Sequence, residues 1–421
     1  MFFRDHELKW CTGRAVGLVT MRASPFRVEL GCGLLRKYGQ TQRRYKEVHG
    51  VAAKVEDASV RFTLAATAYR YGDTAQAARL RELTEALTSD EAGRIEANAA
   101  YHELEPFLHT VAADCAGQGS DLPLPPALLE RWSQVHAREM ARTAVIHFGA
   151  VKALSALEQA GIRAVPLKGF CLSSRFYARK SARGFKDLDL LVEEASLAGL
   201  HEALLAVGYE PAPGRPAFVP APAFTVYKLP MEDKVTAMEI DIHIGMHWPE
   251  EYERRTSFYA LDLWDQASQV EVEGLRLWTL SAEHLLITTL LDAAVNHRYA
   301  RLIKFRDALE ILRAAEIDWS AVDGWCCRWQ VRSFVGPGLC YLAEIDPSIS
   351  APPAIRDSLL PSYAAMRSFL RALPADRLAD HRSRSFSLAN LLFFALADTP
   401  RERARGLLYV PQHLVKGRHR F

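Results

Sequence analysis

The sequence predicts an α+β protein in which a small β-rich core lies between two helical regions. Before residue 160 and after residue 281, apolar residues recur every three or four positions, which is the helical period. Between these regions, short apolar runs alternate with polar residues, as they do in strands. Hydrophobic residues make up 49% of the 421 residues and charged residues 24%, the balance of a globular chain rather than a disordered one.

The two ends of the chain are basic. Residues 1–50 carry ten Lys and Arg against four Asp and Glu, and residues 401–421 carry six against one. We interpret residues 1–50 as a poorly ordered basic extension and residues 399–421 as a basic tail, which is either solvated or binds phosphates. The net charge of the whole chain is only +2, so DNA is not an expected partner.

Cysteine usage and hydropathy point to the compartment. The seven cysteines are scattered and show no CxxC spacing, which predicts reduced thiols in a cytoplasmic protein. Because no apolar run approaches about 18 residues, no membrane partner is expected.

The first helical region is predicted over residues 51–160. Helical spacing runs from about Val60 to Thr110, and a Gly- and Pro-rich stretch at 117–126 interrupts it. One long helix then follows from Ala127 and ends at Gly161, a residue type common just past a helix C-terminus.

The core is predicted over residues 161–280 and the second helical region over 281–398. The core is expected to run strand, helix, basic loop, strand, helix and two hairpin strands, over residues 162–167, 168–177, 178–184, 185–192, 194–207, 224–229 and 236–244. The second helical region begins with helices over 282–295 and 301–315.

Lys168-Gly169 lies at a predicted strand-to-helix junction. Gly allows the backbone to approach a ligand closely, and the free N–H groups of a helix N-terminus bind phosphate oxygens. Lys168 adds a positive charge. The alternative is an ordinary turn, because Lys-Gly pairs are common in turns.

Asp187-Leu-Asp189 lies inside an apolar predicted strand. Side chains alternate along a strand, so both carboxylates project from one face while Leu188 and Leu190 enter the core. Neighbouring carboxylates repel each other unless a cation lies between them, and Mg²⁺ prefers such oxygen ligands. A solvated strand face is the alternative. Because Leu191 and two further apolar neighbours continue the strand, we expect a central strand.

A third acidic pattern, Glu239-Ile-Asp-Ile-His243, lies on another predicted strand. Alternation places Glu239, Asp241 and His243 on one face. If this strand lies beside the strand of Asp187 and Asp189, Asp241 completes a cluster of three carboxylates. Such a cluster can hold two Mg²⁺ ions that bind the phosphates of a nucleotide.

From about residue 60 to 370 the chain resembles the uncharacterised bacterial nucleotidyltransferase group of the DNA polymerase beta-like nucleotidyltransferase superfamily. The resemblance rests on an ordered set of short motifs: Ala160-Gly-Ile162, Leu167-Lys-Gly169, Tyr177, Arg183, Asp187-Leu-Asp-Leu-Leu-Val192, Gly208-Tyr209, Ile240-Asp-Ile-His243 and Leu280-Ser-Ala-Glu283. It implies a nucleotidyltransferase core with a mixed β-sheet, flanked by N-terminal and C-terminal helical regions.

The resemblance also implies roles for particular residues. Asp187 and Asp189 match the paired metal ligands and Asp241 the third carboxylate, so these three are the expected catalytic and metal-binding residues. Lys168, Gly169 and Arg183 are the expected nucleotide-binding residues. Lys186 departs from the pattern, since relatives often have Gly immediately before the first Asp.

Three further residues are expected around this site. His243 either orients Asp241 or contacts the acceptor, with a structural role as the alternative. His297 and Lys304 belong to a basic cluster that either closes over the nucleotide or forms a solvated face, completed by Arg298, Arg301 and Arg306.

These features favour a Mg²⁺-dependent nucleotidyltransferase with two metal ions, or Mn²⁺ in their place. It would transfer a nucleoside monophosphate from an NTP to the hydroxyl of an unknown acceptor, which is a small molecule, a peptide, a protein or RNA, and release pyrophosphate. Two alternatives remain open: a non-catalytic partner protein that retains the fold, and a toxin-type nucleotidyltransferase that acts on RNA.

Overall fold

The structure is a computed structural model of the chain. It describes residues 57–85, 87–211, 224–229, 238–244, 260–272, 274–349, 351–359, 369–371, 373–380, 396–401 and 403. The predicted basic extension, residues 1–50, lies outside the described residues, as does most of the predicted tail over 399–421. All described residues belong to one compact unit, which starts at Asp57.

Five helices precede the sheet: α2 Ala58–Thr67, α3 Thr74–Glu85, α4 Ser89–Tyr101, α5 Glu105–Gly117 and α6 Pro126–Gln159. The starts of α2 and α4 follow from side-chain capping. Asp57 accepts a hydrogen bond from the Ser59 N–H at the start of α2, and Thr88 and Glu91 form a capping box at α4. Gly161 takes a positive φ of 69° just after α6, as predicted for the end of that helix.

The central sheet has five strands: β1 Ala164–Pro166, β2 Asp187–Val192, β3 Glu210–Pro211, β4 Phe224–Leu229 and β5 Met238–His243. Their spatial order is β1-β2-β5-β4-β3. β2 and β5 pair in parallel, and the other neighbouring strands pair antiparallel, so the sheet is mixed. β2 is a central strand, and β4 and β5 pair antiparallel, as the sequence predicts.

Short helices connect these strands: α7 Lys168–Arg175, the 3-10 turns Lys180–Ala182 and Glu194–Ser196, and α8 Leu197–Ala206. After the sheet come α10 Ala260–Trp264 and a hairpin of β6 Ser268–Val272 and β7 Leu275–Thr279, with Gly274 in its turn at a φ of 78°. The hairpin packs beside β1 and α6. Sequence periodicity did not predict it.

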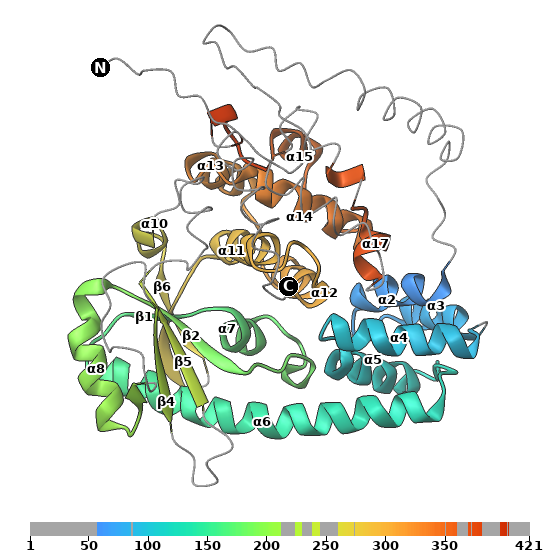
Figure 1. The fold of residues 1–421 in the computed structure, drawn as a ribbon, viewed down its shortest axis with the longest axis horizontal. Helices are drawn as coiled ribbons and strands as arrows, with labels where there is room; N and C mark the ends of the chain where they lie inside the picture. The colour runs from blue at the N-terminus through green and yellow to red at the C-terminus, as the bar shows by residue number, and fades with distance from the viewer. Residues whose placement is uncertain are drawn as a thin grey trace, which may run out of the picture. The chain divides into compact units, whose positions relative to one another are not determined.

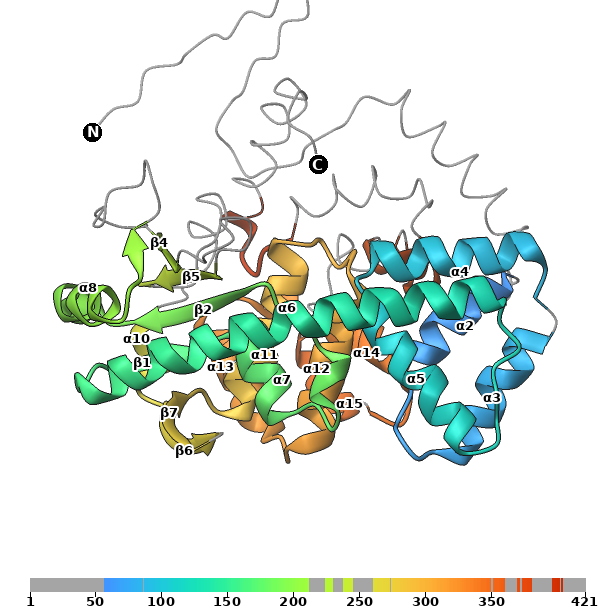
Figure 2. The ribbon, with the colours of Figure 1, turned by 90° about the horizontal axis from the view of Figure 1, so that it is seen from below.

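Helices α6 and α8 cover one face of the sheet (Figures 1 and 2). The core on that face contains alternate residues of β2 and β5, among them Leu188, Leu190, Ile240 and Ile242, packed against apolar side chains of α6 and α8. Since side chains alternate along strands, the residues between them point to the opposite face. The acidic side chains of both strands therefore lie away from α6.

The helices after the sheet are α11 Ala282–Val295, α12 Leu302–Ala314, α13 Trp319–Arg328, α14 Arg332–Ile345, α15 Pro353–Leu359 and α17 Ala375–Ala379. α11 packs on both α12 and α14, while α12, α14 and α17 contact α2 (Figure 1). Helices from the two ends of the described chain thus pack against each other.

The predicted α+β class is confirmed. Along the chain, helices precede and follow the strands of a small mixed sheet. Among the described residues, no helix has both the length and the apolar character needed to cross a membrane.

Candidate active site

The parallel pair of β2 and β5 brings the predicted carboxylates together. In its register, Asp189 lies opposite Asp241, and Asp187 lies opposite Glu239. Because all four residues share the sheet face that α6 leaves uncovered, the three aspartates form one acidic cluster. This is the arrangement that the spacing of the two acidic motifs predicts.

Asp189 is the most buried member of the cluster, with 5% of its surface exposed. One of its oxygens, Oδ1, accepts hydrogen bonds from Lys168 Nζ at 2.7 Å and from His243 Nε2 at 2.9 Å. Burial alone raises the pKa of a carboxyl group, but these two donors outweigh burial and hold the pKa of Asp189 below its ordinary value. Asp189 is therefore stably ionised.

Asp187 and Asp241 behave in the opposite way. Burial, together with the negative charge of Asp189, raises the pKa of both carboxyl groups, and that of Asp241 reaches about 6. The repulsion expected among three carboxylates thus falls on these two residues and not on Asp189. A bound cation would relieve it.

The same side chains fit a metal ion. Asp189, Asp241 and His243 each offer one ligand atom, and these atoms lie within 4.8 Å of one another. Two carboxylate oxygens suit Mg²⁺ or Mn²⁺, and an imidazole nitrogen suits Mn²⁺ better than Mg²⁺. In the metal-free arrangement His243 Nε2 donates a hydrogen bond to Asp189 and thereby orients this carboxylate, while its expected effect on Asp241 stays a prediction.

The Lys168-Gly169 turn opens toward the carboxylates. The Leu167 N–H donates to the backbone oxygen of Asp189 at 2.9 Å, which fixes the end of β1 beside β2. Lys168 then takes a φ of 47°, a conformation unfavourable for a residue with a side chain, and directs its ammonium group to Asp189. A Cβ added at Gly169 would lie 2.5 Å from Cβ of Phe185, so Gly169 allows α7 to approach the start of β2.

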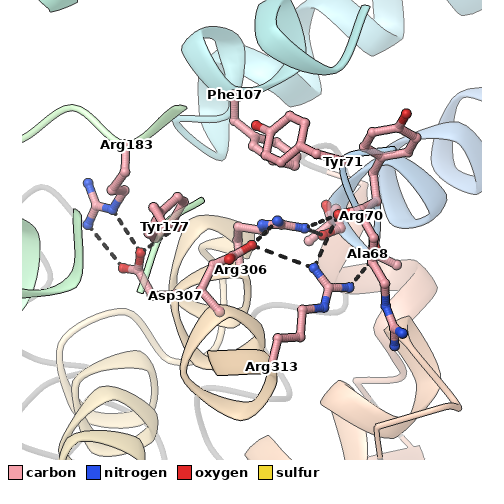
Figure 3. A network of polar contacts seen from close by, with 12 residues as sticks. Ala68, Arg70, Tyr71, Phe107, Tyr177, Arg183, Arg306, Asp307 and Arg313 are labelled. Atoms are coloured by element: carbon pink, nitrogen blue, oxygen red, sulfur yellow. Dashed lines mark hydrogen bonds and ion pairs between the residues drawn. The ribbon is translucent and has the colours of Figure 1, made fainter. Parts of the chain in front are cut away.

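Arg183 forms an ion pair with Asp307, outside the acidic cluster. Its Nε and Nη2 donate to the two oxygens of Asp307 on α12, at 2.8 and 3.0 Å, and the Tyr177 hydroxyl donates to the same carboxylate at 2.7 Å (Figure 3). Burial lowers the pKa of Arg183, but the charge of Asp307 outweighs burial and raises it. The structure thus places Arg183 in a buried bidentate ion pair, and its contact with phosphate stays a prediction.

His297 and Lys304 gather around a different carboxylate, that of Asp292 on α11. Lys304 Nζ lies 2.7 Å and His297 Nε2 3.7 Å from Asp292 Oδ2. Burial of Asp292 opposes its ionisation, but Lys304, Lys168 and His297 outweigh burial and lower its pKa. Burial and the charge of Lys304 in turn lower the pKa of His297 to about 4, so that this histidine is neutral at pH 7.

A cavity joins this group to the acidic cluster through Lys168. Its walls come from the start of α7, from α11 and from α12, and it is lined by Leu167, Lys168, Leu172, Leu285, Thr288, Thr289, Asp292, Lys304 and Asp307.

One member of the predicted basic cluster is buried. The interpretation of this cluster as a solvated face is wrong for Arg306, of which only 1% is exposed.

Asp292 is the residue that motif reasoning missed. It is charged and stands in the apolar run Leu290-Leu-Asp-Ala-Ala-Val295 of a helix that is buried all round. A charged residue inside this apolar run is the available signal, since buried carboxylates in proteins are paired.

Fold and site together define an α+β protein with a metal-competent acidic cluster on adjacent parallel strands. The model of the uncharacterised nucleotidyltransferase family matches residues 88–345, and the chain belongs to this family. A crystal structure of an antigenic nucleotidyltransferase-like protein from Paracoccidioides brasiliensis is similar over 50% of this chain and 91% of that one, with 15% identity and a TM-score of 0.34. No curated protein matches the sequence.

Proposed function

We propose that the protein is a Mg²⁺-dependent nucleotidyltransferase that transfers a nucleoside monophosphate from an NTP to an acceptor hydroxyl. The acceptor oxygen forms a bond to the α-phosphorus, the bond from this phosphorus to the bridging oxygen breaks, and pyrophosphate leaves. The observation that carries the proposal is the parallel register of Asp189 with Asp241, with Asp187 on the same face. Membership of a nucleotidyltransferase family supports it.

In this proposal the acidic and basic residues of the site have different roles. Asp189, Asp187 and Asp241 bind the metal, which when present neutralises phosphate charge and favours ionisation of the acceptor hydroxyl. We assign to Asp241 the role of taking the acceptor's proton, because it shares the sheet face of Asp189 and is less buried than Asp189. Lys168 supplies positive charge for the triphosphate beside these acids.

The presence of all three carboxylates favours catalysis over a non-catalytic role. A protein that only retained the fold would have no need for a buried, ionised Asp189 beside two destabilised acids.

The test replaces Asp189 by Asn and follows the consumption of α-labelled NTPs with Mg²⁺, in the presence of total RNA, cell extract or neither. We expect turnover to fall by at least about a hundredfold, because one donor of the metal site loses its charge. Asp121→Asn, in the exposed segment before α6, is the matched control and should retain turnover. Wild-type turnover in Asp189→Asn would refute the proposal.

A further inference from the structure

Lys168 places its ammonium group on Asp189, the buried carboxylate of the proposed metal site. Its Nζ lies 2.7 Å from Asp189 Oδ1, the same oxygen that accepts the hydrogen bond from His243. An ammonium group and a divalent cation neutralise the same carboxylate charge and therefore compete for it. A cation at this oxygen has to displace the Lys168 ammonium.

A second carboxylate lies where it can receive the displaced ammonium. Asp292 lines the same cavity as Lys168 and is buried and ionised. Lys304 binds its Oδ2 and the Asn296 side-chain amide donates to its Oδ1, and each carboxylate oxygen can accept one more donor. Burial lowers the pKa of Lys168, but the charges of Asp189 and then Asp292 outweigh burial and raise it. Lys168 thus interacts with both carboxylates while contacting one.

We propose that Lys168 is an internal substitute for the divalent cation. Its ammonium neutralises Asp189 in the metal-free protein and moves to the Asp292 side of the cavity when the cation binds. This inference rests on the proposed function, because it takes Asp189 as a metal ligand. It adds that Lys168 weakens binding of the free cation, and that a cation arriving with a triphosphate binds better because the phosphates attract the released ammonium.

The first experiment measures Mn²⁺ binding to the nucleotide-free protein from the electron paramagnetic resonance signal of free Mn²⁺. Lys168→Met removes the competing ammonium, and we expect at least about tenfold tighter binding, since a charge-assisted hydrogen bond no longer has to break. Lys168→Gly should bind equally tightly, and it also relieves the positive φ at this position. Thermal melts verify that both variants are folded.

Lys186→Met is the matched control. Lys186 precedes Asp187, has a 61% exposed side chain and pairs with Glu103 at 3.6 Å. Its removal takes away one positive charge near the cluster without freeing Asp189, so Mn²⁺ affinity should change by less than about twofold at physiological salt. If Mn²⁺ affinity rises equally in Lys168→Met and Lys186→Met, the loss of any nearby positive charge explains the rise, and the inference is overturned.

The second experiment tests the role of Asp292 with a double-mutant cycle. In the wild-type background, Asp292→Asn should weaken Mn²⁺ binding by about tenfold, because the displaced ammonium loses its receiving partner. In the Lys168→Met background the same change should cost much less, since no ammonium moves. Equal losses in both backgrounds would overturn the transfer to Asp292.

The results of these experiments distinguish failure of this inference from failure of the proposed function. Mn²⁺ binding with the same affinity in wild type and Lys168→Met overturns the inference and leaves the proposed metal site intact. Absence of Mn²⁺ binding in all folded variants, with and without NTP, overturns the proposed function itself.

Discussion

Asp189 and Asp241 lie opposite each other on neighbouring strands, yet their surroundings give their charges opposite effects on stability. Lys168 and His243 stabilise the ionised form of Asp189. Asp241 has its pKa raised from 3.8 to about 6 by burial and by the charges of Asp189 and Asp187. Ionisation of Asp241 in the metal-free protein therefore opposes folding. A cation bound beside Asp241 would remove this cost.

This difference predicts the pH dependence of Asp241→Asn. The native protein binds the Asp241 proton more tightly than the unfolded chain, so the contribution of Asp241 to stability falls as pH rises from about 4 to about 6. Asn does not ionise. Above pH 6, without divalent ions, Asp241→Asn should thus be more stable by on the order of 1 kcal/mol, a figure reduced for solvent screening because Asp241 is half-buried.

Urea unfolding in EDTA from pH 4 to pH 7 checks this expectation. The advantage of Asp241→Asn should vanish near pH 4, and the exposed control Asp121→Asn should show no such trend. Asp189→Asn should instead lose about 2 kcal/mol at pH 7, because Lys168 and His243 lose a charged acceptor. A constant difference between Asp241→Asn and wild type across this range would contradict the raised pKa.

Individual residues of the site were predictable where they belong to a local pattern. The alternation in Asp187-Leu-Asp189 and Glu239-Ile-Asp-Ile-His243 places the acids on one face of each strand, and the register of the strands agrees. Asp292 and Asp307 join the site from α11 and α12, more than 100 residues after Asp189 and more than 50 after Asp241. Their contacts depend on tertiary packing, for which no local pattern exists.

At the scale of elements, the long helices and the strands of the central sheet with a clear apolar pattern were predictable, and the hairpin of β6 and β7 was not. The helix expected from Ala127 to Ala160 is α6, Pro126–Gln159, and the helix expected over residues 282–295 has these bounds in α11. The hairpin of β6 and β7 escaped prediction because its strands have only five residues each, and β6 is mostly exposed. Five residues carry too little periodicity to separate a strand from a loop.

The contact between α7 and β2 gives a prediction at this scale. Because a Cβ at residue 169 would lie 2.5 Å from Phe185 Cβ, Gly169→Ala forces α7 and the start of β2 apart. We expect a loss of about 1–3 kcal/mol of unfolding free energy, as for other overpacked sites. Urea unfolding measures it.

Gly93→Ala is the control for this substitution. A Cβ at residue 93 would meet nothing within 4 Å, and Ala favours the helix α4 in which it lies, so stability should rise by up to about 1 kcal/mol. If Gly169→Ala is as stable as Gly93→Ala, α7 can move away from β2 without loss of unfolding free energy, and the prediction is wrong.

At the scale of the whole described unit, buried arginines tie the helices before the sheet to those after it. Arg306 on α12 donates to the backbone oxygens of Thr67 and Tyr69 at the end of α2, and to Glu310 (Figure 3). Arg313 donates to the backbone oxygens of Ala68 and Tyr69. These carbonyls have no amide partner within α2, because they belong to its last residue and to the two residues that follow. The two helical regions separated in the sequence therefore share one polar core.

This shared core predicts that α2 and α12 unfold together. Arg306→Met should cost about 3–5 kcal/mol, because it breaks the buried ion pair with Glu310 and leaves the Thr67 carbonyl oxygen without its donor. Hydrogen exchange should show protection falling in α2 and α12 by the same factor. Arg79→Met, which removes an exposed ion pair with Glu82 within α3, should change stability by less than about 0.5 kcal/mol. If Arg306→Met lowers protection in α2 but leaves α12 at its wild-type level, the helices before the sheet form an independent folding unit.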